Sequence, residues 1–232
     1  MKNIKDAIKS IPVIYNPLVR IVNSLNKRRR SRAYKKYGRE ALQLFVKCMD
    51  ENKFTYTLAF GSLLGDIREH GFIKHDLDID TFIWYEDFSP SILEKLQEYG
   101  FELDRSISIE SDKYGREDTL IYKGVNIDIF YLYKPIDKYP YCCDFVPLFD
   151  IHKRMPRRVE IPIDKSRKQV LFEGIPVFVP SNAEQICEFR YGPNYMTPDP
   201  NWHWVSSYNA IREWPEMMDK VVEISRQNSA SY

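Results

Sequence analysis

Three aspartates at alternate positions, Asp76, Asp78 and Asp80, lead directly into the apolar run TFIWY at residues 81–85. Alternate side chains of a β-strand share a face, so Asp78 and Asp80 should point the same way while Ile79 faces the core. Two carboxylates on one face repel each other unless a cation lies between them. Oxygen ligands favour magnesium (Mg²⁺) or manganese (Mn²⁺) over zinc. The pattern therefore predicts a strand that carries a metal site, with a solvated strand edge as the alternative.

A possible phosphate site precedes this strand. Gly61–Ser62 ends a predicted strand at 54–60 and begins a predicted helix at 62–71. Backbone amides at a helix N-terminus bind phosphate, and glycine lets a phosphate approach the backbone closely. We therefore expect Gly61 and Ser62 to bind a phosphate group, with ordinary turn chemistry as the alternative.

A third carboxylate and two cations could complete the site. Asp128 lies between Ile127 and Ile129 on a predicted apolar strand at 125–133. Burying an isolated carboxylate there would be costly, unless it joins the metal site begun by Asp78 and Asp80. Arg68 follows Ser62 by six residues and Lys74 precedes the acidic strand, so either could neutralise phosphate charge. For both residues, surface solvation is the alternative.

The remaining pattern alternates between strand and helix signals. Ser89 and Pro90 mark a helix start, and Ser181 with Glu184 has the spacing of a capping box. The segment 134–170 is rich in prolines and charges and predicts an irregular surface excursion. Further strands are expected at 101–110, 118–123 and 175–180, and further helices at 38–52, 89–100, 181–192 and 206–226. We predict an α+β fold with a mixed β-sheet and flanking helices.

The first 34 residues differ from the rest of the chain. Isoleucine, leucine and valine recur at roughly helical spacing, interrupted by Pro12 and Pro17, and the segment ends in the basic run NKRRRSR. Such a segment could lie on an anionic membrane surface, or pack as a helix whose basic end is solvated. We expect a basic amphipathic extension at 1–34 and a catalytic domain at 35–232.

Composition narrows the class of protein. The net charge of +1 gives no sign of a polyanionic partner, so no nucleic acid is expected. No apolar run is long enough to span a membrane, and the N-terminus lacks the apolar region of a secretory signal. The four cysteines lack zinc-ligand spacing and indicate a reducing compartment. We expect a cytoplasmic protein, with peripheral association at the inner face of a membrane through residues 1–33 as an option.

The order strand, Gly-Ser, helix, D-x-D strand and later carboxylate is similar to that of the nucleotidyltransferase superfamily. Within it, residues 61–80 resemble the hallmark of the LicD family, and residues 127–130 and 174–200 resemble that family's second acidic strand and C-terminal signature. The chain departs from the hallmark at Ser62, at Lys74–His75 and at Leu77. The hallmark positions that agree are Gly61, Leu63, Leu64, Gly65, Arg68, Gly71, Phe72, Ile73, Asp76, Asp78, Ile79 and Asp80.

This resemblance implies a phosphotransferase that uses a CDP-activated donor. It would move phosphocholine, or a related phospho-alcohol such as phosphoribitol or phosphoglycerol, to a sugar hydroxyl of a glycan or lipid-linked saccharide, for example in lipopolysaccharide, teichoic acid or capsule. Asp78, Asp80 and Asp128 would be the catalytic and metal-binding residues. Gly61, Ser62, Arg68 and Lys74 would bind the donor phosphates.

Three alternatives remain open at this point: a nucleotidyltransferase acting on a small acceptor, a metal-dependent D-x-D glycosyltransferase, and a non-catalytic nucleotide- or glycan-binding module. His75 could assist catalysis or serve as a loop residue. Trp202, His203 and Trp204 could form a shelf for the acceptor, since aromatic faces suit sugars and choline, or could close the domain.

Overall fold

The computed structural model describes residues 12–148, 153–199, 202 and 210–226, with side chains from residue 25 onward. Its helices are α2 (Pro12–Glu51), α3 (Phe60–Glu69), α4 (Pro90–Glu98) and α5 (Ala183–Tyr191), with 3₁₀ turns at Tyr85–Asp87 and Pro215–Lys220. Its strands are β1 (Thr57–Leu58), β2 (Asp78–Trp84), β3 (Glu102–Ile109), β4 (Gly115–Tyr122), β5 (Val125–Leu132), β6 (Tyr141–Pro147), β7 (Arg154–Glu160), β8 (Arg167–Phe172), β9 (Ile175–Pro180), β10 (Ile211–Glu213) and β11 (Val221–Ser225).

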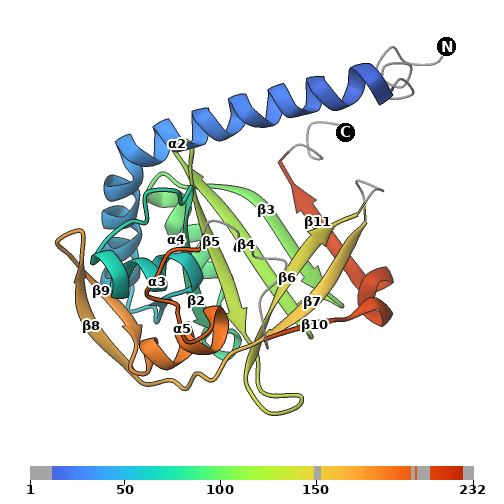
Figure 1. The fold of residues 1–232 in the computed structure, drawn as a ribbon. Coiled ribbons are helices and arrows are strands. Elements are labelled where there is room, and N and C mark those ends of the chain that lie inside the picture. The colour runs from blue at the N-terminus through green and yellow to red at the C-terminus, as the bar shows by residue number, and fades with distance from the viewer. Residues whose placement is uncertain (1–11, 149–152, 200–201, 203–209, 227–232) are drawn as a thin grey trace.

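A six-stranded mixed sheet forms the centre of the molecule, in the order β1-β2-β5-β4-β3-β11 (Figure 1). β2 and β5 run parallel, and all other neighbours in this sheet are antiparallel. One face is apolar, because Ile79 of β2 and Ile127 and Ile129 of β5 are fully buried. The predicted α+β fold with a mixed sheet and flanking helices is confirmed.

Helices cover this sheet and place the acidic strand. α2 packs on β2 and β5, while α3 packs on β2 and on α5. The last part of α2 buries Leu42, Phe45 and Met49, whereas its beginning extends past the sheet (Figure 1). The expected boundary between residues 34 and 35 falls inside α2, which continues through it. No helix in the described part of the chain combines the length and the apolar composition needed to cross a membrane.

The segment 134–170 is not an irregular excursion, so that prediction was wrong. β6 and β7 form a hairpin within it, β7 also pairs with β10 to complete a three-stranded sheet, and β8 pairs with β9. Two of the charges that suggested a loop neutralise each other inside the sheet instead. Arg157 Nε and Nη2 donate to the two Asp144 oxygens at 2.7 and 2.6 Å, and both residues are buried.

Two predictions near the C-terminus were also wrong. Of the expected closing helix at 206–226, residues 206–209 lie outside the described part of the chain, and the rest forms β10, a 3₁₀ turn and β11, which pairs with β3 and extends the main sheet. Val221, Val222 and Ile224 are β-branched and favour a strand. The capping box of Ser181 and Glu184 does not form, because α5 begins at Ala183 with Asn182 at its N-cap and no side-chain cap hydrogen bond. At α4, by contrast, Ser89 caps the helix as predicted.

Candidate active site

The parallel pair β2 and β5 brings the predicted acidic residues together. Asp80 lies directly opposite Asp128, and Asp78 lies opposite Asn126. Neighbouring strands are about 4.8 Å apart, and residues in register point to the same face. Asp78, Asp80 and Asp128 therefore share one face of the sheet, opposite the buried Ile79 and Ile127.

Three atoms of Asp80 form hydrogen bonds with the residues at the start of α3. The Ala59 amide donates to the Asp80 carbonyl at 2.9 Å, and the Gly61 amide donates to Asp80 Oδ2 at 3.0 Å. The Asp80 amide donates in turn to Ser62 Oγ at 3.0 Å. α3 begins at Phe60, so Gly61 and Ser62 lie within its first turn rather than before it. In this structure, the Gly61 amide and the Ser62 hydroxyl hold the acidic strand in place.

Gly61 also leaves space for two carboxylates. A methyl group on Gly61 would lie 2.9 Å from Asp76 Oδ2 and 3.2 Å from Asp80 Oδ2. Both distances are shorter than ordinary van der Waals contact. The aspartates therefore require a glycine here, whereas the sequence pattern suggested that its small size serves an approaching phosphate.

Burial and mutual repulsion weaken the acidity of this cluster. Burial, and secondarily the charge of Asp78, raise the pKa of Asp76 to about 7 and that of Asp128 to about 6. Burial, together with Asp78, Asp128 and Asp76, raises the pKa of Asp80 well above its ordinary value. The site therefore concentrates negative charge that the protein itself does not fully neutralise.

Protein donors hold individual carboxylate oxygens. Arg30 Nη2 of α2 donates to Asp78 Oδ2 at 3.0 Å. Thr119 Oγ1 of β4 donates to Asp128 Oδ1 at 2.6 Å and accepts from Arg105 Nη2 of β3 at 3.1 Å. The sequence analysis missed these three residues, because their places beside the acids depend on strand pairing and on the direction of α2.

The carboxylate oxygens of this site are chemically suited to bind a hard divalent cation. Asp78, Asp80 and Asp128 offer oxygen ligands on a single face, as Mg²⁺ and Mn²⁺ prefer. Their side chains stand apart, since among the described residues no three Asp, Glu, His or Cys side chains converge closely enough to hold a metal ion. Burial and the neighbouring carboxylates raise the pKa of Asp80 and Asp128, and a bound cation would offset that repulsion.

The predicted cations lie at different places around the acids. Arg68 of α3 lies close enough to Asp76 for its charge to lower the pKa of that carboxyl, and its Nη2 donates to the Thr197 carbonyl at 3.2 Å. Arg68 Nε is buried and has no partner among the described residues. Lys74 and His75 are exposed. Of these three, Arg68 has the described electrostatic contact with the cluster.

The C-terminal segment approaches the same region through α5. Burial, and less strongly the charges of Asp80 and Asp76, raise the pKa of Tyr191. Trp202 packs on the Tyr191 ring with a centroid distance of 5.1 Å, and its indole N–H is buried without a partner among the described residues. His203 and Trp204 lie outside the described residues.

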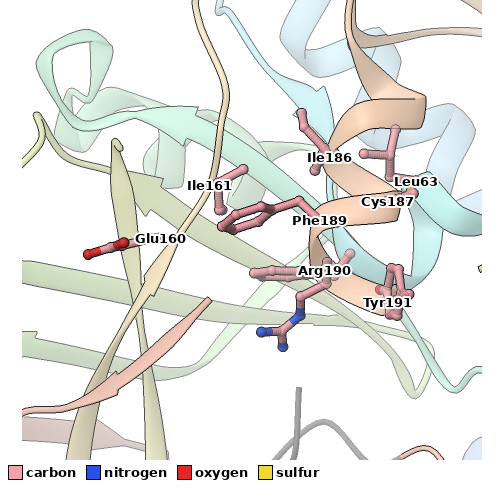
Figure 2. A pocket seen from close by; sticks show the side chains of 9 residues that line it. Leu63, Glu160, Ile161, Ile186, Cys187, Phe189, Arg190 and Tyr191 are labelled. Atoms are coloured by element: carbon pink, nitrogen blue, oxygen red, sulfur yellow. The ribbon is translucent and has the colours of Figure 1, made fainter. Parts of the chain in front are cut away.

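Phe60, the first residue of α3, lines a small cavity beside α5. Figure 2 shows the α5 side chains that line this cavity, including Arg190. The cavity measures about 10 Å³, which is room for one water molecule at most. The Phe60 ring packs on Phe82 and Phe130 at centroid distances of 5.0 and 4.8 Å, and the Arg190 guanidinium lies 5.1 Å from the same ring. This cavity is part of the aromatic packing beside the acids and is too small for a nucleotide.

Comparison with known proteins identifies the family. The family model described as LicD/FKTN/FKRP, nucleotidyltransferase domain, matches residues 53–182, more than half of the chain. The chain belongs to this family. The matched LicD/FKTN/FKRP region runs from the segment before β1 to the N-cap of α5, and contains Gly61, Ser62 and all three aspartates of the β2–β5 face.

Relatives of this LicD/FKTN/FKRP chain include named transferases. The protein named ribitol-5-phosphate transferase FKTN from Mus musculus is 26% identical over 203 residues, covering 82% of this chain and 41% of the relative. The protein of the same name from Homo sapiens is 23% identical over 202 residues, covering 83% and 41%. An uncharacterized protein of Caenorhabditis elegans is 38% identical over 111 residues, covering 44% and 28%. The chain thus spans about two fifths of the length of the FKTN relatives.

Proposed function

We propose that this LicD/FKTN/FKRP chain is a Mg²⁺- or Mn²⁺-dependent phosphotransferase. It would move a phospho-alcohol from a CDP-activated donor to a sugar hydroxyl of a glycan. The observation that carries the proposal is the in-register pairing of Asp80 with Asp128, with Asp78 on the same face. The name of the FKTN relatives favours phosphoribitol over phosphocholine or phosphoglycerol as the transferred group.

Asp78 and Asp80 would hold the metal ion and Asp128 would complete the set. A bound Mg²⁺ or Mn²⁺ supplies charge neutralisation for the donor diphosphate. Arg68 lies on the α3 side of the cluster, where it can offset charge on the departing CMP. Most of the acceleration would come from positioning and neutralisation of charge, as in other phosphoryl transfers.

Asp128 has a further role as the base. Thr119 donates to one of its oxygens, which leaves the other oxygen to accept a proton from the acceptor hydroxyl. The acceptor hydroxyl oxygen attacks the phosphorus that carries the alcohol. The bond from that phosphorus to the CMP oxygen breaks, CMP leaves with the bonding pair, and the hydroxyl proton passes to Asp128.

A donor panel tests this proposal. Purified protein with Mg²⁺ is incubated with CDP-ribitol, CDP-glycerol, CDP-choline, UDP-sugars and ATP, and release of CMP, UDP or pyrophosphate is measured, with water or added saccharides as acceptors. CMP release supports the phosphotransferase, and UDP release would indicate a glycosyltransferase. Pyrophosphate release would indicate a nucleotidyltransferase, and tight binding without turnover would indicate a binding module.

The variant Asp128→Asn tests whether the activity comes from the aspartates on β2 and β5. Because the variant loses the proposed base and one metal ligand, turnover should fall at least ~100-fold, the scale of losing one catalytic interaction. Asp50→Asn, an exposed aspartate on α2, is the matched control and should retain full activity. Near-normal turnover by Asp128→Asn would remove Asp128 from the mechanism.

The basic part of α2 supports a position at the inner face of a membrane. Its exposed cations attract anionic headgroups without burying apolar surface. The four cysteines are free and buried, which suits the reducing cytoplasm. Sedimentation with vesicles, with and without phosphatidylserine, measures this attraction. The exposed basic residues are Lys27, Arg28, Arg29, Arg32, Lys35, Lys36 and Arg39.

A further inference from the structure

One arginine of the basic run differs from its neighbours. Arg28, Arg29 and Arg32 are exposed, whereas Arg30 is half-buried and turned toward the sheet. Arg30 lies one helical turn before the buried Tyr34 and two turns before Gly38, which packs near Phe72. Positions i, i+4 and i+8 share one face of a helix, so α2 presents Arg30 on its domain-facing side.

Arg30 ends at the acidic cluster. Its Nη2 lies 3.0 Å from Asp78 Oδ2, with the two side chains 40% and 35% exposed. Its charge also counts among those that lower the pKa of Asp128. A helix from one end of the described chain therefore delivers a positive charge to carboxylates on two separate strands.

This contact contributes little to folding stability. An ion pair between two partly exposed side chains stabilises a protein only weakly. At the same time, Arg30 Nε is buried with no hydrogen-bond partner among the described residues, and an unsatisfied buried donor is costly. Arginine offers five donors in a planar fork, of which a single one is bonded to Asp78 here. The guanidinium thus has donor capacity beyond its one described bond to Asp78.

We infer that Arg30 is a movable cation of the site. With the site free, it neutralises Asp78. When a divalent ion binds Asp78, the guanidinium is displaced from that oxygen and its fork binds the phosphate groups that accompany the ion, a geometry for which arginine is suited. This inference deepens the proposed function and rests on it, since it assigns a residue outside the matched region 53–182 to donor binding.

Two binding measurements, neither of which requires turnover, test the inference. Mn²⁺ binding is followed by electron paramagnetic resonance in the wild type, in Arg30→Gln and in the control Arg29→Gln, an exposed neighbour of equal charge. Removing the competing cation should tighten Mn²⁺ binding about two- to fivefold in Arg30→Gln, the scale of a partly exposed ion pair. Arg29→Gln should leave it nearly unchanged.

Inorganic pyrophosphate is then titrated in the presence of saturating Mn²⁺. Arg30→Gln should bind it about tenfold more weakly, as expected for losing charge-assisted hydrogen bonds to phosphate. Equal effects of the two variants, weaker Mn²⁺ binding in Arg30→Gln, or no Mn²⁺ or pyrophosphate binding by the wild type would overturn the inference. A failed donor panel combined with these opposite shifts would reject the CDP donor while leaving the role of Arg30 intact.

Discussion

Two groups of aspartates lie on the sheets of this molecule, and they differ in how their charge is balanced. Asp118 of β4 receives two hydrogen bonds from Arg116, at 2.8 and 3.0 Å, and a third from the Tyr131 hydroxyl at 2.8 Å. Asp144 of β6 is bound in the same bidentate manner by Arg157. In this first group, each buried carboxylate receives a bidentate pair of hydrogen bonds from one guanidinium.

The second group, on the face shared by β2 and β5, has no such arrangement among the described residues. Asp80 receives a backbone amide, Asp128 receives a threonine hydroxyl, and Asp78 receives a single arginine nitrogen. Burial and the neighbouring carboxylates raise the pKa of both Asp80 and Asp128. Buried carboxylates with full partners serve the fold, whereas a cluster left short of positive charge is suited to bind a cation from solution.

The largest expected effect tests the paired group. Arg157→Met leaves the Asp144 charge buried without its bidentate partner, so the free energy of unfolding should fall by about 3–5 kcal/mol. Urea denaturation followed by circular dichroism measures it. Lys220→Met, which breaks the pair with Glu110 in which both side chains are exposed, should cost less than about 1 kcal/mol. Similar losses for both variants would contradict the structural role of the Asp144–Arg157 pair.

The next largest effect concerns Gly61, which lies against the carboxylates of Asp76 and Asp80. Gly61→Ala places a methyl group against Asp76 and Asp80, and overpacking of this kind should lower the free energy of unfolding by about 1–3 kcal/mol. Gly38→Ala in α2 is a matched control, because its methyl would meet its neighbours at 3.6 Å or more. Within a helix, that change should instead stabilise by about 0.5–1 kcal/mol. Thermal denaturation separates the opposite signs.

The smallest effect is a pH-dependent gain in stability from removing the charge of Asp128. Asp128 has a pKa of about 6 in the folded protein, above the ordinary aspartate value of 3.8. Between these values the folded state binds more protons, so this group makes the wild type less stable as pH rises from about 4 to 7. Asp128→Asn should therefore be more stable than wild type by about 1 kcal/mol at pH 8, allowing for partial exposure.

The stability gain of Asp128→Asn should shrink toward zero near pH 4. In the wild type, Mg²⁺ at a concentration equal to its dissociation constant should raise the free energy of unfolding by about 0.4 kcal/mol. Denaturation series at pH 4, 6 and 8 measure both. An equal gain at every pH would show that the amide improves packing and that charge is not the cause. No gain at pH 8 would place Asp128 with the paired aspartates.

Sequence patterns predicted the acidic strand well because its signal is local. The alternation of Asp78, Ile79 and Asp80 defines two faces, and the glycine turn at Lys123–Gly124 defines the hairpin that carries Asp128 into the sheet. The parallel pairing of β2 with β5, which aligns Asp80 with Asp128, depends on contacts between distant segments. Its register could not be read from either strand alone.

The errors at 134–170 and at β11 share a physical origin, which is that strand pairing overrides local signals. Charged residues in β6 and β7 suggest exposure, but Asp144 and Arg157 neutralise each other once the strands pair. The sequence of β11 resembles the end of a helix. Val222 and Ile224 are exposed, so burial does not define this strand, and backbone pairing to β3 does. In the sequence, Arg30 is one member of a basic run, because only the packing of α2 shows which of its sides faces the domain.

The pairing of β2 with β5 has a consequence for how this scaffold can diversify. The spacing between Asp80 and Asp128 is set by main-chain hydrogen bonds between adjacent strands, and is therefore independent of the side chains in the surrounding loops. Loops and appended segments could be exchanged while the two carboxylates of the proposed site keep their spacing. The register of β2 and β5 itself cannot change, since a shift of either strand by a single residue would turn its aspartates to the opposite face.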